Sequence, residues 1–328
     1  MSKKLGGARE LSFPQGAHFA FTVMDDTDDA TLENVEPIYR LLETLGMRTT
    51  KTVWSMPCEE GSPDFAGSST LDDSAYREFV IDLQRRGFEI AFHGATMESS
   101  RRERTIRALE RFAATFGRLP RVHANHSFNQ ENLYWGADRL DDPILRMLYG
   151  RMLGRPNGFF QGHQPDSPYW WGDLCAKDIE YVRNLSFADV NLLRVNPSMP
   201  YRDERRPYGR LWFSASDAEN ADEFVALLTE ANQRRLEEEA GVCIVATHFG
   251  KGFCANGAVR DDVAAVLTAL AKRRGWFVPV GTLLDHLREA RGGDGLPSDE
   301  WRRMQWRWAR DLVGRRLRFL RRQTKRQR

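Results

Sequence analysis

The feature that most constrains the fold of this 328-residue chain is a regular alternation of short apolar runs with segments of helical periodicity. Apolar runs fall at 17–24, 50–55, 88–92, 121–126, 190–195, 209–214, 242–247 and 276–280. Between them, apolar residues recur every three or four positions over 31–45, 72–86, 100–116, 221–240, 261–274 and 282–290. Strands that alternate with helices of this length predict a parallel sheet covered by helices.

The number of repeats predicts an α/β fold in which about seven or eight parallel strands form a single β/α barrel. The alternative is a doubly wound open sheet. No GxGxxG or GxxxxGK[ST] motif follows the first strand, so the usual support for a nucleotide-binding version is missing. The aromatic-rich range 129–189 interrupts the rhythm, and we expect it to form long loops over one mouth of the barrel.

The C-terminus differs from the rest of the chain in charge. Range 301–328 contains twelve Lys or Arg and one acidic residue, Asp311, which leaves a net charge of −9 for the first 300 residues because the whole chain carries +2. We therefore divide the chain into a catalytic domain at 1–290, a flexible linker at 291–300 and a basic helical tail at 301–328.

The tail is expected to be amphipathic. On a helix, one side carries Trp301, Met304, Trp308, Leu312 and Phe319, and arginines occupy most of the rest. This pattern predicts peripheral binding to an anionic membrane surface, with packing of the apolar stripe against the barrel as the alternative. Specific nucleic-acid binding is not expected, because no recognised module accompanies the arginines.

Composition places the chain among globular proteins. With 41% hydrophobic and 29% charged residues, it can bury a large core. We expect a cytoplasmic location, since no signal peptide or apolar segment of about 20 residues is evident. The cysteines lack a CxxC pair and are expected to be reduced bystanders: Cys58, Cys175, Cys243 and Cys254.

Polar residues follow several of the predicted strands. Asp25 and Asp26 end the first, and His93, His126 and His248 each end a later one. The strand ends of a β/α barrel meet at one face, so these residues are expected to converge there. Taken alone, the Asp pair is a solvated turn or a helix cap, and any single His is a hydrogen-bonded structural residue. Together they favour metal-assisted hydrolysis.

The motifs around these residues carry a family resemblance. Val23-Met24-Asp25-Asp26-Thr27 resembles the Thr-Phe-Asp-Asp-Gly motif of the NodB-like polysaccharide deacetylases, carbohydrate esterase family 4. Range 86–93 resembles that family's Gly-His-Glu-Ile-x-x-His motif, with Phe88 in place of its first His, and Ala246-Thr247-His248 lies where a late strand of the family delivers a His.

The resemblance implies a deformed β/α barrel and a divalent metal, with zinc first and Mn, Co or Ni as alternatives. It implies that Asp25 is the general base, Asp26 and His93 are metal ligands, and His248 is the acid that protonates the leaving amine. The family's third ligand position is Met97 here, and a thioether is a poor ligand for such metals. We therefore predict His126 as the third ligand.

Other residues remain open for these roles. Glu98, His123 and His163 are alternatives to His126 as the third ligand. Substrate binding is predicted for a set of amide, imidazole, aromatic and basic side chains: His123, Asn129, Trp135, Trp170, Trp171 and Lys251. The simpler interpretation is that the tryptophans only cap the barrel, and that Gly250 and Gly252 beside Lys251 only form a turn.

The function that the resemblance implies is hydrolysis of an N-acyl group, acetyl or formyl, from an amino sugar. A nucleotide-linked or lipid-phosphate-linked precursor of cell-surface glycan, such as O-antigen, is the expected substrate. A catalytically silent glycan-binding barrel is the alternative from another class. A glycosidase that uses paired carboxylates is a third.

Overall fold

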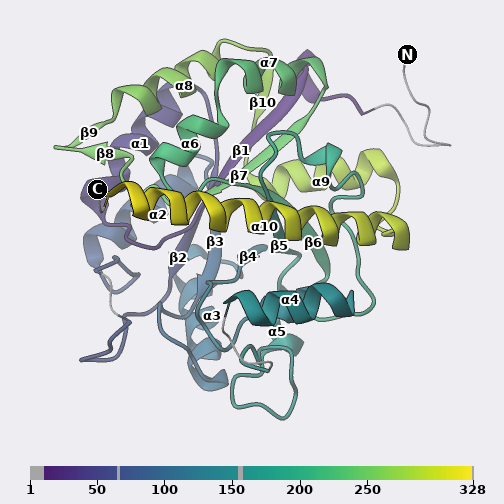
Figure 1. Ribbon diagram of the computed structural model, residues 1–328. Coiled ribbons are helices and arrows are strands. Elements are labelled where there is room, and N and C mark those ends of the chain that lie inside the picture. The colour runs from purple at the N-terminus through teal and green to yellow at the C-terminus, as the bar shows by residue number, and fades with distance from the viewer. Residues whose placement is uncertain (1–10, 65–66, 154–157, 327–328) are drawn as a thin grey trace.

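The structure, a computed structural model, describes residues 11–64, 67–153 and 158–326 (Figure 1). Within this part of the chain, seven parallel strands close into a barrel, because β1 pairs with both β2 and β7. The strands are β1 (Phe19–Asp25), β2 (Thr50–Trp54), β3 (Glu89–Gly94), β4 (Val122–Ala124), β5 (Tyr181–Phe187), β6 (Leu211–Asp217) and β7 (Val242–Thr247). The barrel prediction is confirmed, and the open sheet is excluded.

The barrel is deformed at β1. Phe19–Phe21 of this strand pair with an extra strand, β10 (Gly275–Phe277), whereas β2 pairs only with Met24 and Asp25. β10 therefore occupies the place that a longer β2 would take along the first half of β1. The carboxyl half of β1, which carries the Asp pair, is the half that β2 and β7 hold together.

Helices cover the outside of the barrel. They are α1 (Leu32–Thr44), α2 (Ser74–Arg85), α3 (Arg102–Phe116), α4 (Pro143–Leu153), α5 (Gly172–Asp178), α6 (Ala221–Leu227), α7 (Glu230–Glu238), α8 (Asp261–Ala271), α9 (Val280–Arg291) and α10 (Ser298–Arg326). Two short strands, β8 (Cys254–Ala255) and β9 (Ala258–Val259), form a hairpin before α8. The helix predicted at 221–240 is divided, because the Thr229 side chain caps a new helix by accepting a hydrogen bond from Asn232 N.

One predicted strand is wrong. Range 190–195 contains a short 3₁₀ helix, Leu192–Arg194, which begins where the Asn191 side chain accepts a hydrogen bond from Leu193 N. The fifth strand is β5, which lies inside the range that we predicted as loops. Its apolar pattern is interrupted by Arg183 and Asn184, both of which are buried. Range 129–189 therefore forms loops, as predicted, except where it contains α4, α5 and β5.

The C-terminal helix α10 packs on the barrel. It lies across the front of β5 and β6 and above α4 in Figure 1. Trp301, Met304 and Trp308 are 1–3% exposed and belong to the hydrophobic core. Hydrogen bonds add to this contact, because Asp311 accepts one from Ala188 N and Glu300 accepts one from Ser198 N. The packing alternative is therefore the one observed for this stripe, and the side chain of Phe319 lies outside the described residues.

The expected linker is short and anchored. α9 ends at Gly292, whose φ of 68° is left-handed, and α10 begins at Ser298. The Arg291 guanidinium donates to the carbonyl oxygens of Pro200 and Gly295, which ties this turn to the barrel. No described helix has both the length and the apolar character that a membrane span requires.

Candidate functional site

A pocket of about 350 Å³ opens at the carboxyl ends of the barrel strands. The residues that line it include Asp26, Asp28, His93, Asn125, His126, Trp135, Arg139, Tyr149, Arg183, Asp217, Glu219, His248, Lys251, Trp308, Leu312 and Arg315. The convergence predicted for the strand ends of β1, β3, β4 and β7 is present. One wall comes from α10, which we had treated as an appendage.

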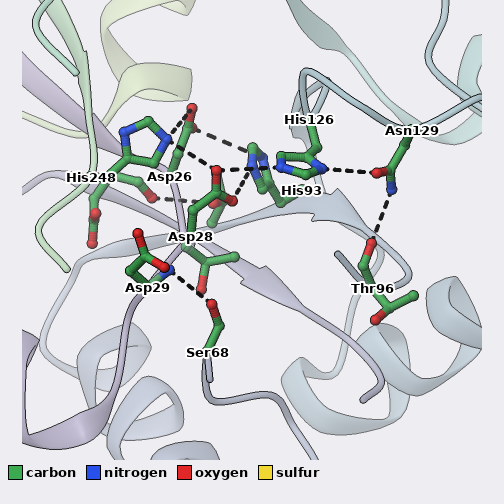
Figure 2. Close-up of polar contacts among 12 residues, drawn as sticks. Asp26, Asp28, Asp29, Ser68, His93, Thr96, His126, Asn129 and His248 are labelled. Atoms are coloured by element: carbon green, nitrogen blue, oxygen red, sulfur yellow. Dashed lines mark hydrogen bonds and ion pairs between the residues drawn. The ribbon is translucent and has the colours of Figure 1, made fainter. Parts of the chain in front are cut away.

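Asp28 lies at the centre of the polar groups (Figure 2). The Nε2 atom of His93 is 3.3 Å from its Oδ1 atom, and the Nε2 atoms of His126 and His248 are 3.4 Å and 3.3 Å from its Oδ2 atom. Burial alone would raise the pKa of Asp28, but the three imidazoles hold it well below the usual range. Asp28 is therefore an anion that faces three imidazole nitrogens.

Hydrogen bonds fix which nitrogen of two of these imidazoles carries a proton. The Nδ1 atom of His248 is 2.8 Å from the carbonyl oxygen of Glu219, which can only accept. The Nδ1 atom of His126 is 2.8 Å from Oδ1 of Asn129, whose amide nitrogen already donates to Thr96 O and Glu131 Oε1. Both rings therefore carry hydrogen on Nδ1, and their Nε2 lone pairs face Asp28 when the rings are neutral.

Asp26 also faces the pocket, but it is held by an arginine. Nη1 of Arg183 donates to Oδ1 of Asp26 at 2.9 Å, and Nη2 donates to Oδ2 in a bidentate pair. His93 Nδ1 and His248 Nε2 each lie 4.0 Å from this carboxylate. Burial opposes ionisation, and the charges of Arg183, His93 and His248 outweigh it and lower the pKa of Asp26.

Asp25, which we predict as the general base, does not line the pocket. Its carboxylate is fully buried, 3.0 Å from Lys51 Nζ, and accepts hydrogen bonds from Tyr39 Oη at 2.9 Å and Phe249 N at 2.8 Å. Neighbouring residues of a strand point to opposite sides, so only Asp26 of the pair is directed into the site. Asp25 instead joins β1 to β2, α1 and the segment after His248.

The donor atoms around Asp28 are imidazole nitrogens and carboxylate oxygens, which are the donor types that bind divalent metals. Both ring nitrogens of His93 and Oδ1 of Asp28 are buried without a hydrogen-bond partner. Two ligands with bonds of about 2.0 Å in a tetrahedral site are roughly 3.3 Å apart, which is the separation found between Asp28 and each imidazole. Among the described residues, no group of three or more His, Cys, Asp or Glu has the geometry of a metal site.

Several residues predicted for substrate binding serve the fold instead. Ring nitrogens of His123 lie 2.9 Å from Phe92 O and 3.1 Å from Asn125 Oδ1, and burial lowers the pKa of His123 to about 4. Trp171 is buried and donates to Glu131 O, whereas Trp170 packs against Tyr208. None of these three predicted residues lines the pocket.

The remaining predicted residues lie in or beside the pocket. Trp135 and Lys251 line it, and Lys251 Nζ is 3.3 Å from Glu219. Asn129 contacts His126 rather than the open space. Glu98 pairs with Arg104, and His163 lies near Asp138, so neither replaces His126 in the cluster around Asp28. Of the possible third ligands, His126 is the one that the structure brings to Asp26, Asp28 and His93.

Sequence reasoning missed two residues of the cluster and a wall of the pocket. Asp28 is not among the predicted site residues, although its position only three residues after Asp25 is a usable signal. Arg183 was overlooked because β5 was not recognised, and a basic residue inside a buried strand would have indicated an acidic partner. Trp308, Leu312 and Arg315 were assigned to the tail.

Comparison with known proteins supports the fold. No family model and no curated protein matches the sequence. A putative polysaccharide deacetylase from Mycobacterium smegmatis is similar in structure with a TM-score of 0.51 and 15% identity, over 90% of this chain and 99% of that chain.

Two further structures are similar with TM-scores below 0.5. One is a probable polysaccharide deacetylase from Pseudomonas aeruginosa PAO1 (TM-score 0.48, 13% identity, 84% of this chain and 93% of that chain). The other is the PuuE allantoinase (TM-score 0.49, 12% identity, 84% of this chain and 92% of that chain). The match to the mycobacterial structure shows that this chain shares the fold of that protein.

Proposed function

We propose that the protein is a metal-dependent hydrolase that removes an N-acyl group, acetyl or formyl, from an amino sugar. The observation that carries the proposal is the approach of three imidazole Nε2 atoms to within 3.3–3.4 Å of Asp28 in the pocket. Burying a charge opposes folding unless the charge is well compensated. A protein that only binds glycan has no need for such a buried anion, whereas a metal-dependent hydrolase does. The NodB-like fold makes C–N bond hydrolysis the first reaction to test.

The proposed metal ligands are Asp28, His93 and His126. This set keeps His93 and His126 as predicted and replaces Asp26 by Asp28. Oxygen and imidazole donors suit zinc, with Mn, Co and Ni as alternatives. The bound cation would polarise the acyl carbonyl and make a water molecule more acidic.

The protein's own groups would move the protons. Asp26, kept anionic by Arg183, accepts the proton of the attacking water at its carboxylate. His248 protonates the leaving amine from Nε2, since the carbonyl of Glu219 holds the other ring proton in place. Burial alone would lower the pKa of His248, but Asp28 and Asp26 raise it, which favours the protonated form of the ring.

The wider biological setting is also a proposal. A precursor of cell-surface glycan, nucleotide-linked or lipid-phosphate-linked, remains the expected substrate. Cytoplasmic location and attachment to an anionic membrane surface also remain predictions. The buried Trp301, Met304 and Trp308 are not available to a membrane, so the apolar stripe no longer supports the membrane prediction at these positions.

The test combines metal content with release of a primary amine from N-acetyl and N-formyl amino sugars. Asp28→Asn and His126→Ala are expected to lower metal affinity at least tenfold and to abolish amine release. Asp29→Asn is the matched control, because Asp29 adjoins Asp28 but does not line the pocket, and Asn tolerates its φ of 59°. Stoichiometric metal in the two ligand variants would refute the assignment. Metal binding by the wild type without amine release from any N-acyl sugar would favour the glycan-binding alternative.

A further inference from the structure

Arg139 is an unusual cation in the wall of the pocket. It ends the 3₁₀ helix Gly136–Arg139 in the loop after β4 and is only 7% exposed, yet it lines the same cavity as Asp28 and His248. Its guanidinium carbon lies 3.9 Å from the ring centre of Trp135 and 4.5 Å from that of Trp308 on α10. Two aromatic faces therefore hold the guanidinium in one orientation.

The other cations of the pocket wall have carboxylate partners. Arg183 pairs with Asp26, Arg315 pairs with Asp217, and Lys251 lies near Glu219. Among the described residues, Arg139 has no such ion pair. Its hydrogen bonds run to the carbonyl oxygens of Gly136 and Asn184 and are long, at 3.4 and 3.5 Å.

Packing alone does not explain a charge at this place. Burying a guanidinium without an anion is unfavourable, and an apolar side chain would pack between the two indoles without that penalty. Burial lowers the pKa of Arg139, the Tyr149 hydroxyl opposes this shift, and Arg315 and Arg183 lower the pKa further. Three guanidiniums thus act on one another around this part of the pocket, and two of them are already neutralised by Asp.

We propose that Arg139 binds an acidic group of the substrate, a carboxylate or a phosphate, and so selects an anionic N-acylated sugar. This inference rests on the proposed function for the identity of the reaction, although the acid-binding role itself does not need hydrolysis. A planar guanidinium donates two parallel hydrogen bonds to either oxyanion. The cavity of about 350 Å³ is at the lower end of small-molecule sites, which suits a sugar unit with one acidic substituent.

The first experiment needs no variant. Binding and amine release are measured for the full chain with N-acetylglucosaminuronic acid, its neutral primary amide, N-acetylglucosamine and an N-acetylglucosamine phosphate. We expect at least one acidic sugar to bind on the order of 10- to 100-fold more tightly than its neutral counterpart. The uronate and phosphate arms identify the source of the charge. Equal binding of each acid and its neutral counterpart would overturn the inference.

The second experiment changes Arg139 itself. Arg139→Met keeps a long side chain between the two indoles and removes the charge, whereas Arg139→Lys keeps the charge without the planar donor pair. We expect the methionine variant to lose the preference for the acid, seen as a rise in the KM of the acidic sugar relative to the KM of its neutral counterpart, and the lysine variant to keep part of it. Arg303→Met, at an exposed position of α10 paired with Asp299, is the charge control.

The outcomes separate this inference from the proposed function. Acid-selective binding that depends on Arg139, without amine release from any sugar, would support the inference and refute the hydrolase. Amine release that ignores the acidic group and is unchanged in Arg139→Met would support the hydrolase and overturn the inference. If Arg139→Met does not fold, the wild-type comparison and Arg139→Lys still decide.

Discussion

Replacing Lys51 by Met should destabilise the fold by leaving one buried carboxylate without its counter-charge. Lys51 Nζ and Asp25 Oδ2 are 3.0 Å apart, and both side chains are 0% exposed. Removing one partner of a buried pair typically costs about 3–5 kcal/mol. Hydrogen bonds to Asp25 from Tyr39 and Phe249 remain in this variant, so the lower end, about 3 kcal/mol, is expected.

A double-mutant cycle measures this effect directly. Asp25→Asn in the Lys51→Met background removes the stranded charge, and an amide can still accept from Phe249 N and donate to Tyr39. The double variant should therefore be more stable than Lys51→Met, as measured by urea denaturation of the three variants and the wild type. A cost below about 1 kcal/mol for Lys51→Met, or a double variant that shows the sum of both costs, would refute the reasoning.

The same variants decide whether Asp25 or Asp26 is the base. A folded Asp25→Asn, Lys51→Met protein should keep metal and lose less than about tenfold in kcat, because Asp25 only positions the segment after His248. Asp26→Asn should lose about 10²-fold or more with little change in stability. A folded, metal-loaded double variant without activity would return the base role to Asp25.

Four further predictions concern the imidazoles around Asp28, the close packing at Gly250 and the helix α10. Burial alone would lower the pKa of His126 and of His248, but in the metal-free protein Asp28 raises both. Zinc added near pH 7 should therefore displace protons from these imidazoles. The release is measured by calorimetry in buffers of different ionisation enthalpy. Since these folded-state pKa values exceed the unfolded value of about 6.5, metal-free stability should fall as pH rises above that value, and pH-independent stability would contradict this. Gly250→Ala should lower the free energy of unfolding by about 1–3 kcal/mol and weaken metal binding, because the new Cβ would lie 2.5 Å from the backbone carbonyl carbon of Asp29. Gly293→Ala, whose Cβ would have no atom within 4 Å, is the control. Both variants are compared by denaturation and by metal titration. A chain ending at Gly293 should lose roughly 5 kcal/mol of unfolding free energy, because it lacks three buried side chains of α10. A chain ending at Arg316 keeps these side chains and should not lose it. Equal urea midpoints for the two chains would contradict a stabilising role of α10.

Much of the architecture could be predicted from the sequence because barrel strands leave strong local patterns. β1, β3 and β7 are mostly apolar runs, since both faces of a parallel barrel strand are covered. β5 escaped detection because a long-range ion pair, Arg183 with Asp26, satisfies its buried charge, and the partner lies 157 positions away. The same difference between local patterns and long-range contacts applies to the site. The histidines at the strand ends could be predicted from the local sequence, whereas the residues that lie beside them in space could not.

The turn after β1 explains why Asp28, and not the predicted Asp26, lies closest to the three imidazoles. Asp26 N still donates to Thr247 O, so the chain remains tied to β7 beyond the last residue of the strand. Asp29 then adopts a φ of 59°, and its backbone N donates to Ser68 Oγ (Figure 2). This turn sets Asp28 under the three imidazoles, and no sequence pattern specifies the direction of a turn that a distant serine holds.

The Asp pair at the end of β1 therefore has two different tasks. Asp25 accepts hydrogen bonds from α1 and from Phe249 N and pairs with β2, so a single buried carboxylate holds the segment that carries His248 against β1. Asp26 and Asp28 face the opposite side and meet Arg183 and the imidazoles. If Asp25 were released to act as a base, the segment after β7 would lose its anchor and His248 its position. On the proposed assignment, Asp25 holds the segment that carries His248 and Asp26 accepts the proton, so we expect stability to respond to Asp25 and activity to respond to Asp26.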